Sequence, residues 1–294
     1  MVSVKTFFFA ALAAAVSAAP SRPPRHNAHY TLPSVGGGAR DLTPPAPHLV
    51  LKKIALGHGI QNYTCGPATD YGSSNSTAAT ALGAVAVLYD LTPFYPGTKG
   101  TGLPQDVWDS LPSKVLWDRP LPLNRRQGTQ FGADPDQPFP NPPEDLRLPG
   151  TTTTTSSSSS SSYGHSYGDS CGGGGGGGGS SSDTAKFLGH HYFDAEGVPV
   201  FDLSAGAGTG TGPTALRAAV AKTESVPAPE SADRGIMNTG AVAWLRLDDN
   251  GLGYSQEVAV VYRVLTAGGG PQVCSVTGEG VHSVPYATYY WFYG

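Results

Sequence analysis

The stretch from residue 241 to residue 270, AVAWLRLDDNGLGYSQEVAVVYRVLTAGGG, decides the fold. It holds two apolar runs separated by Asp-Asp-Asn-Gly at 248–251, a sequence typical of the turn between two antiparallel strands. In the second run Val260 and Tyr262 fall on one face and Val261 and Arg263 on the other, which is the period of a β-strand. The stretch therefore predicts a β-hairpin.

The same period of two prevails on either side of this hairpin. Residues 48–65 predict two short strands, residues 82–91 a buried strand, and the aromatic run 286–293 a final strand. The sequence offers one helix candidate, Thr214–Lys222, introduced by Pro213. The predicted fold class is all-β, a compact β-sandwich or barrel-like domain with a long disordered low-complexity insertion.

Composition divides the chain into four parts. Residues 1–18 combine one positive charge, an apolar run and a small-residue exit, which indicates a signal peptide. Residues 19–47 are rich in Pro and Gly and predict a disordered leader, while residues 100–184 predict a largely disordered insertion rich in Pro, Gly and Ser. Its first half retains Trp108 and Trp117 and could dock on a neighbouring surface. Residues 48–99 and 185–294 then form a single β domain.

Charge and targeting signals narrow the choice of partner and compartment. Of 294 residues, 18 are Lys or Arg and 22 are Asp or Glu, a net charge of −4 that disfavours binding to nucleic acid. No apolar run is long enough for a membrane span, so we expect no membrane association after signal removal. The signal peptide predicts a secreted, extracellular protein, which could reside in the cell wall. Asn62 and Asn75 head sequons and are predicted to carry glycans, Asn75 being the better candidate.

Three cysteines in an oxidising compartment predict one disulfide and one remaining thiol. Cys65 and Cys274 lie in structured-looking segments, whereas Cys171 precedes eight consecutive glycines. We therefore predict a Cys65–Cys274 disulfide, with Cys171 free or bonded to a partner.

Few residues suggest catalysis. His191 could act as a general base together with a carboxylate such as Asp202, or join His58 or His282 in a polar cleft, although a structural role for His191 is the simpler interpretation. The glycines at 206–212 have the wrong spacing for a dinucleotide-binding turn, and no Cys/His spacing fits zinc. We expect no cofactor and no metal.

The last strand is aromatic on both faces. Such rings could stack on sugars, although packing in the core is the alternative that we favour. The strand contributes Tyr286, Tyr289, Tyr290, Trp291, Phe292 and Tyr293.

Several segments together resemble the DUF3455 family of secreted fungal and bacterial proteins, a domain of unknown function. The resemblance rests on residues 51–65, 83–93, 188–203, 241–274 and 284–294. It includes Gln-x-Tyr-x-Cys, the His-Tyr pair before a Gly-containing turn, the Arg-Val-x-Thr-x-Gly-Gly strand end and the closing Tyr-rich strand. It implies a secreted β-rich domain without established catalytic residues. Some fungal members carry a malate dehydrogenase label, which the motifs of this sequence do not support.

The resulting hypothesis is a non-enzymatic extracellular or cell-wall-associated β domain that binds a glycan, such as a cell-wall polysaccharide, or a protein partner. The alternative is a secreted hydrolase that uses His191 with a carboxylate. An oxidoreductase is the weaker alternative.

Overall fold

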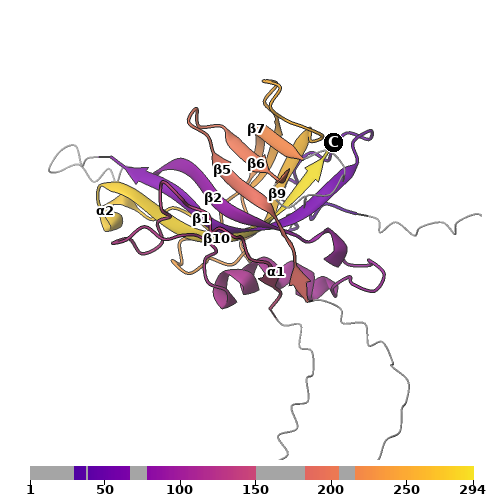
Figure 1. Cartoon of the computed structure of the whole chain (residues 1–294), viewed down its shortest axis with the longest axis horizontal. Helices are drawn as coiled ribbons and strands as arrows, with labels where there is room; N and C mark the ends of the chain where they lie inside the picture. Colours follow the sequence, from indigo (N-terminus) through magenta and orange to yellow (C-terminus); the bar gives the residue numbers. More distant parts are fainter. Residues whose placement is uncertain (1–29, 38, 67–77, 150–182, 205–215) are drawn as a thin grey trace, which may run out of the picture.

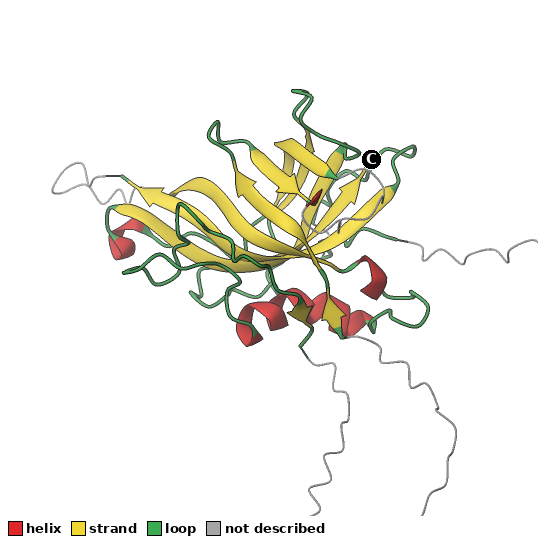
Figure 2. Ribbon diagram, viewed as in Figure 1, coloured by secondary structure: helices red, strands yellow, loops and turns green. Residues whose placement is uncertain are grey.

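The computed structural model describes residues 30–37, 39–66, 78–149, 183–204 and 216–294. Within these residues, eight antiparallel strands close into a barrel, and a smaller layer that contains the longer helix α1 covers part of its outer surface (Figures 1 and 2). The barrel strands are β1 (Leu51–Cys65), β2 (Thr80–Asp90), β5 (Phe187–Phe193), β6 (Pro199–Asp202), β7 (Arg217–Val226), β8 (Trp244–Asp249), β9 (Val260–Gly268) and β10 (Gly280–Tyr293). The fold class predicted from the sequence is confirmed, as a barrel rather than a sandwich.

The order of the strands around the barrel follows the chain, and β10 closes it by pairing with β1. The hairpin predicted from residues 241–270 forms as β8 and β9, with Leu247 opposite Val261. The predicted turn at 248–251 is wrong in its place, because Asp248 and Asp249 belong to β8 and residues 250–259 connect the strands. The two short strands predicted over 48–65 are the single strand β1. The described residues also form the short helices η1 (Thr92–Phe94) and α2 (Cys274–Thr277) and a two-stranded sheet of β3 (Leu146–Arg147) and β4 (Thr184–Ala185).

Side chains alternate between the two faces of each strand, and both faces of β1 and β10 are buried. On β10, Tyr286, Tyr290 and Phe292 belong to the cluster inside the barrel, while Tyr289 and Trp291 belong to the larger outer cluster. A Cβ at Gly57 would lie 2.6 Å from the ring of Tyr290, so the absence of a side chain makes room for this ring inside the barrel.

The outer face of the barrel is covered by a helix in a segment predicted to be flexible. Helix α1 (Gln105–Asp118) places Trp108 against Tyr289, with ring centroids 4.4 Å apart, and the Tyr289 hydroxyl donates to the Trp108 carbonyl at 2.8 Å. The prediction of disorder for 100–184 is therefore wrong for residues 100–149, because their apolar side chains complete a core that composition alone did not reveal. Docking of this half was correctly anticipated: Trp108 is buried, and the Trp117 indole donates to Asp233 at 2.8 Å.

The second half of the predicted leader is also ordered. Tyr30 lies against Tyr95, with ring centroids 4.9 Å apart, and the hydroxyl of Tyr262 donates to the carbonyl of Thr43 at 2.8 Å. Arg40 forms an ion pair with Glu224 at 2.5 Å. The expectation of a disordered leader over 19–47 therefore does not hold for residues 30–37 and 39–47, which contact the outer surface of the barrel.

The predicted helix Thr214–Lys222 is wrong: residues 217–226 form strand β7. Ala and Lys favour helices, but β7 pairs with β6 on one side and β8 on the other, and this pairing closes the barrel. Tertiary pairing thus overrides the local preference.

The predicted disulfide between Cys65 and Cys274 is present, with the two Cα atoms 5.5 Å apart. It links the end of β1 to helix α2, which precedes β10. Cys171, Asn75, the predicted signal peptide 1–18 and the low-complexity residues 150–182 lie outside the described residues. Among those that are described, no helix has the length and apolar character to cross a membrane.

Candidate functional site

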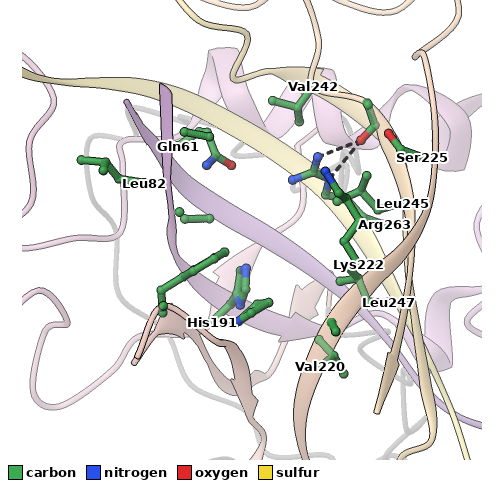
Figure 3. Close-up of a pocket in the computed structure, with 18 of the residues that line it drawn as sticks. Gln61, Leu82, His191, Val220, Lys222, Ser225, Val242, Leu245, Leu247 and Arg263 are labelled. Carbon is green, nitrogen blue, oxygen red and sulfur yellow. Dashed lines mark hydrogen bonds between the residues drawn. The ribbon is translucent and has the colours of Figure 1, made fainter. Parts of the chain in front are cut away.

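A pocket of about 930 Å³ lies inside the barrel, and every barrel strand contributes to its wall. Its lining is mostly apolar, with a small number of polar side chains among aliphatic ones (Figure 3). The principal side chains are Gln61, Tyr63, Leu82, His191, Phe193, Val220, Lys222, Val242, Leu245, Leu247, Asn250, Arg263 and Tyr290. This composition is typical of a cavity for a small molecule.

His191, the candidate base, does line this pocket. It lies on β5, is 3% exposed, and its ring stacks on Phe201 with centroids 4.0 Å apart. Because Nδ1 lies 2.8 Å from the Val200 carbonyl, Nδ1 carries the proton and Nε2 remains an acceptor. The pKa of His191 is lowered to about 4, mainly by burial and to a lesser degree by the nearby Arg263 charge, while the hydrogen bond with Val200 opposes this shift. The imidazole is therefore neutral at ordinary pH and a weak base.

Asp202 does not join His191. In the β5–β6 pairing His191 lies opposite Phe201, whereas Asp202 lies opposite His190, so Asp202 and His191 project from opposite faces of the sheet. The Asp202 carboxylate accepts hydrogen bonds from the backbone and hydroxyl of Ser204. The base–carboxylate pair predicted from the sequence is therefore not assembled.

The other two candidate histidines also lie elsewhere. His58 lies on β1 and lines a separate cavity beneath residues 119–147. Among the described residues, neither of its ring nitrogens has a hydrogen-bond partner. His282 lies on β10, and its Nε2 donates to the Gly278 carbonyl at 2.9 Å. Neither residue contributes to the pocket inside the barrel.

Tyr63 and Tyr290 line the pocket, and Tyr286 contacts Tyr290 beside it. The hydroxyls of Tyr286 and Tyr290 are 3.0 Å apart, and that of Tyr63 donates to the Gly269 carbonyl at 2.6 Å. Burial raises the pKa of all three, and the positive charge of Arg263 partly opposes each rise. All three therefore stay protonated.

Sequence reasoning missed the two basic residues of the pocket, Arg263 on β9 and Lys222 on β7. The Arg263 guanidinium donates from Nε and Nη2 to the Ala243 carbonyl, at 3.1 and 2.8 Å. A signal was present, since Arg263 interrupts an otherwise apolar strand face that includes Val261. Lys222 gave no such signal because its segment was interpreted as a helix.

The aromatic residues of the last strand are buried and do not form a sugar-stacking platform. All six, Tyr286 and Tyr289 to Tyr293, are at most 6% exposed. The preference for core packing over stacking on sugars is confirmed.

Asn62, a predicted glycosylation site, lies half-buried on the outer face of β1, where its Oδ1 accepts a hydrogen bond from Ser283 at 2.7 Å. Its glycosylation stays a prediction.

The described part of the chain contains no group of three or more His, Cys, Asp or Glu side chains that could hold a metal ion. The pocket instead combines two cations, a neutral imidazole, the Gln61 amide and aliphatic walls. This arrangement can bind a small molecule through apolar contact and a few directed hydrogen bonds.

The fold and the pocket together define a class: a closed antiparallel β-barrel with an internal cavity suited to a small molecule. The chain belongs to the family described as "Protein of unknown function (DUF3455)", whose model matches residues 45–294. The resemblance noted in the sequence is thus confirmed. No curated protein and no solved structure matches the chain.

Proposed function

We propose that the protein is a secreted, non-enzymatic binding protein that holds a small, mostly apolar molecule inside its barrel. The observation that carries this proposal is the cavity of about 930 Å³ lined by every barrel strand. Its size lies within the range of about 300–1,000 Å³ typical of small-molecule sites. The interior of a barrel of about eight strands is wide enough to hold one small ligand.

The walls of the cavity favour an apolar ligand over a sugar. Val220, Leu245 and Leu247 line it with aliphatic groups, and Leu82 and Leu252 lie at its rim, 47% and 64% exposed. Burying such surface against an apolar ligand is favourable by about 25 cal/mol per Å². A polysaccharide or protein partner, as expected from the sequence, would bind elsewhere on the surface.

The disulfide supports secretion, since such bonds persist in oxidising compartments. The hydrolase alternative loses support because Asp202 lies on the other face of the sheet from His191. The oxidoreductase alternative gains none, because the described fold is a meander of antiparallel strands rather than alternating strands and helices.

Titration with N-phenyl-1-naphthylamine, an uncharged dye whose fluorescence rises in apolar surroundings, tests the proposal. The full chain should show saturable binding at one site. Leu245→Trp fills part of the cavity and should weaken binding about tenfold or more, since a tenfold change needs only about 1.4 kcal/mol. Val276→Trp is the matched control, because Val276 is 78% exposed on α2 and does not line the cavity.

Equal effects of the two variants, or no saturable binding by the unaltered chain, would contradict the proposal. Retention on insoluble chitin, glucan or cellulose is a separate measurement of the polysaccharide partner. Retention that is unchanged in Leu245→Trp would place a polysaccharide site outside the cavity.

A further inference from the structure

The cavity inside the barrel carries positive charge without a compensating acid. Arg263 and Lys222 line it, and none of its described lining residues is Asp or Glu. Lys222 lies opposite Leu247 and Arg263 opposite Leu245, so both basic side chains project from the same face of the sheet into the cavity. Figure 3 shows both of them extending into it, with Gln61 and His191 across from them in this view.

Several other basic residues of the barrel pair with acids, although Arg217 at the start of β7 has no acidic partner among the described residues. Arg246 lies on β8 but on the outer face of the barrel, where it pairs with Asp248 at 2.9 Å. Lys53 on β1 pairs with Asp90 at 2.6 Å. Across the described ranges, Arg263 forms no ion pair, and the side chain of Lys222 has neither an ion pair nor a hydrogen bond. Two like charges in a partly enclosed space repel each other, and an anion between them would remove that cost.

Arg263 is already oriented for such an anion. Two of its nitrogens, Nε and Nη2, are held by the Ala243 carbonyl, so the guanidinium is fixed before any ligand binds. The third nitrogen, Nη1, is not held by Ala243 (Figure 3), and the guanidinium also interacts with the Tyr290 hydroxyl inside the cavity. A donor fixed in advance loses little conformational entropy on binding.

Arg263 is the charged residue that acts on its titratable neighbours in the cavity. The Arg263 charge acts on the pKa of His191, Tyr63 and Tyr290, and no carboxylate contributes to any of these three shifts. Gln61 is 6% exposed, and its amide has no hydrogen-bond partner among the described side chains and backbone, so it remains a further donor toward a bound anion.

We infer that the ligand is an amphipathic carboxylate, whose anionic group lies between Arg263 and Lys222 and whose apolar body lies against Leu245 and Leu247. This inference rests on the proposed function and adds the chemistry of the ligand to it. A carboxylate matches the donors of a guanidinium and an ammonium group, and charge-assisted hydrogen bonds are about twice as strong as neutral ones. The aliphatic walls then select a ligand with an apolar chain or ring.

The test uses a matched pair of competitors, decanoate and 1-decanol, which share a ten-carbon chain and differ in their head group. Each displaces N-phenyl-1-naphthylamine from the full chain near pH 7. We expect decanoate to compete at a concentration about tenfold or more below that of decanol. Equal potency, or stronger competition by decanol, overturns the inference while leaving the proposed function standing; absence of dye binding overturns both.

Variants assign the preference to particular residues. Lys222→Met should reduce the ratio of the two potencies severalfold. The variant should fold, because the exposed side chain of Lys222 makes no hydrogen bond to the described chain and its backbone pairing in β7 is kept. Arg263→Met should remove the preference for decanoate, so that the two competitors become about equally potent. Because this change leaves the Ala243 carbonyl without its donors, the fold of the variant is checked by circular dichroism. Arg246→Met, on the outer face, is the matched control and should keep the ratio of the unaltered chain. A ratio unchanged in Lys222→Met and in folded Arg263→Met contradicts the inference.

Discussion

Acidification should destabilise this protein through two buried neutral histidines, His58 and His191. Burial lowers the pKa of each to about 4, from a usual value of 6.5. The unfolded chain therefore binds more protons than the folded chain between these values. The stability due to the neutral rings is complete above about pH 6.5 and is lost as the pH falls toward about 4.

The size of the loss follows from the two pKa values. Between pH 7 and pH 5 each histidine accounts for about 2 kcal/mol of the free energy of unfolding, so the pair accounts for about 4 kcal/mol. His190, whose pKa is also lowered by burial, acts in the same direction.

Urea unfolding at pH 7 and pH 5, followed by tryptophan fluorescence, measures this loss. His58→Leu should remove about half of it, because a leucine takes no proton. The variant should fold, since His58 is 1% exposed and among the described residues its ring nitrogens have no hydrogen-bond partner to lose. Val276→Ala, at an exposed side chain that takes no proton, is the control and should keep the pH dependence of the unaltered chain. A pH-dependent loss that is the same with and without His58 would refute the reasoning.

Three further changes test the packing. Replacing both Cys65 and Cys274 by Ser opens a link between residues 209 positions apart and should cost about 3–5 kcal/mol, measured by urea unfolding against the oxidised chain; an unchanged midpoint would contradict this. Trp108→Ala should lower the free energy of unfolding by about 3–5 kcal/mol, because the indole is 1% exposed between α1 and the barrel. A decrease below about 1 kcal/mol, measured by calorimetry, would mean that α1 does not complete the core. Gly57→Ala should cost about 1–3 kcal/mol by displacing Tyr290, with a cost near zero contradicting the close approach.

The hairpin and the disulfide were predictable because their signals are local or chemical. Residues 248–251 mark a turn, and only three cysteines compete for pairing. Closure into a barrel was not predictable, because it depends on the pairing of β10 with β1, more than 200 residues apart in the chain. Helix α1 was missed because its partners lie on distant strands, and the apolar content of its own segment is low.

The candidate site was predictable only in part. The alternation of His190 and His191 was visible in the sequence, but the register that sets Asp202 opposite His190 was not. Arg263 and Lys222 become neighbours only when β7, β8 and β9 curve around a common interior. Their meeting is a property of the closed barrel rather than of any motif.

The most direct test of binding inside the barrel is a methyl NMR titration with decanoate. The methyl groups of Leu245, Leu247 and Val220 should shift together and saturate, because they line the cavity. Those of Val87 and Val115, which belong to the outer core, should remain nearly unchanged. Saturable shifts confined to the outer methyl groups, or no saturable shift anywhere, would contradict the account.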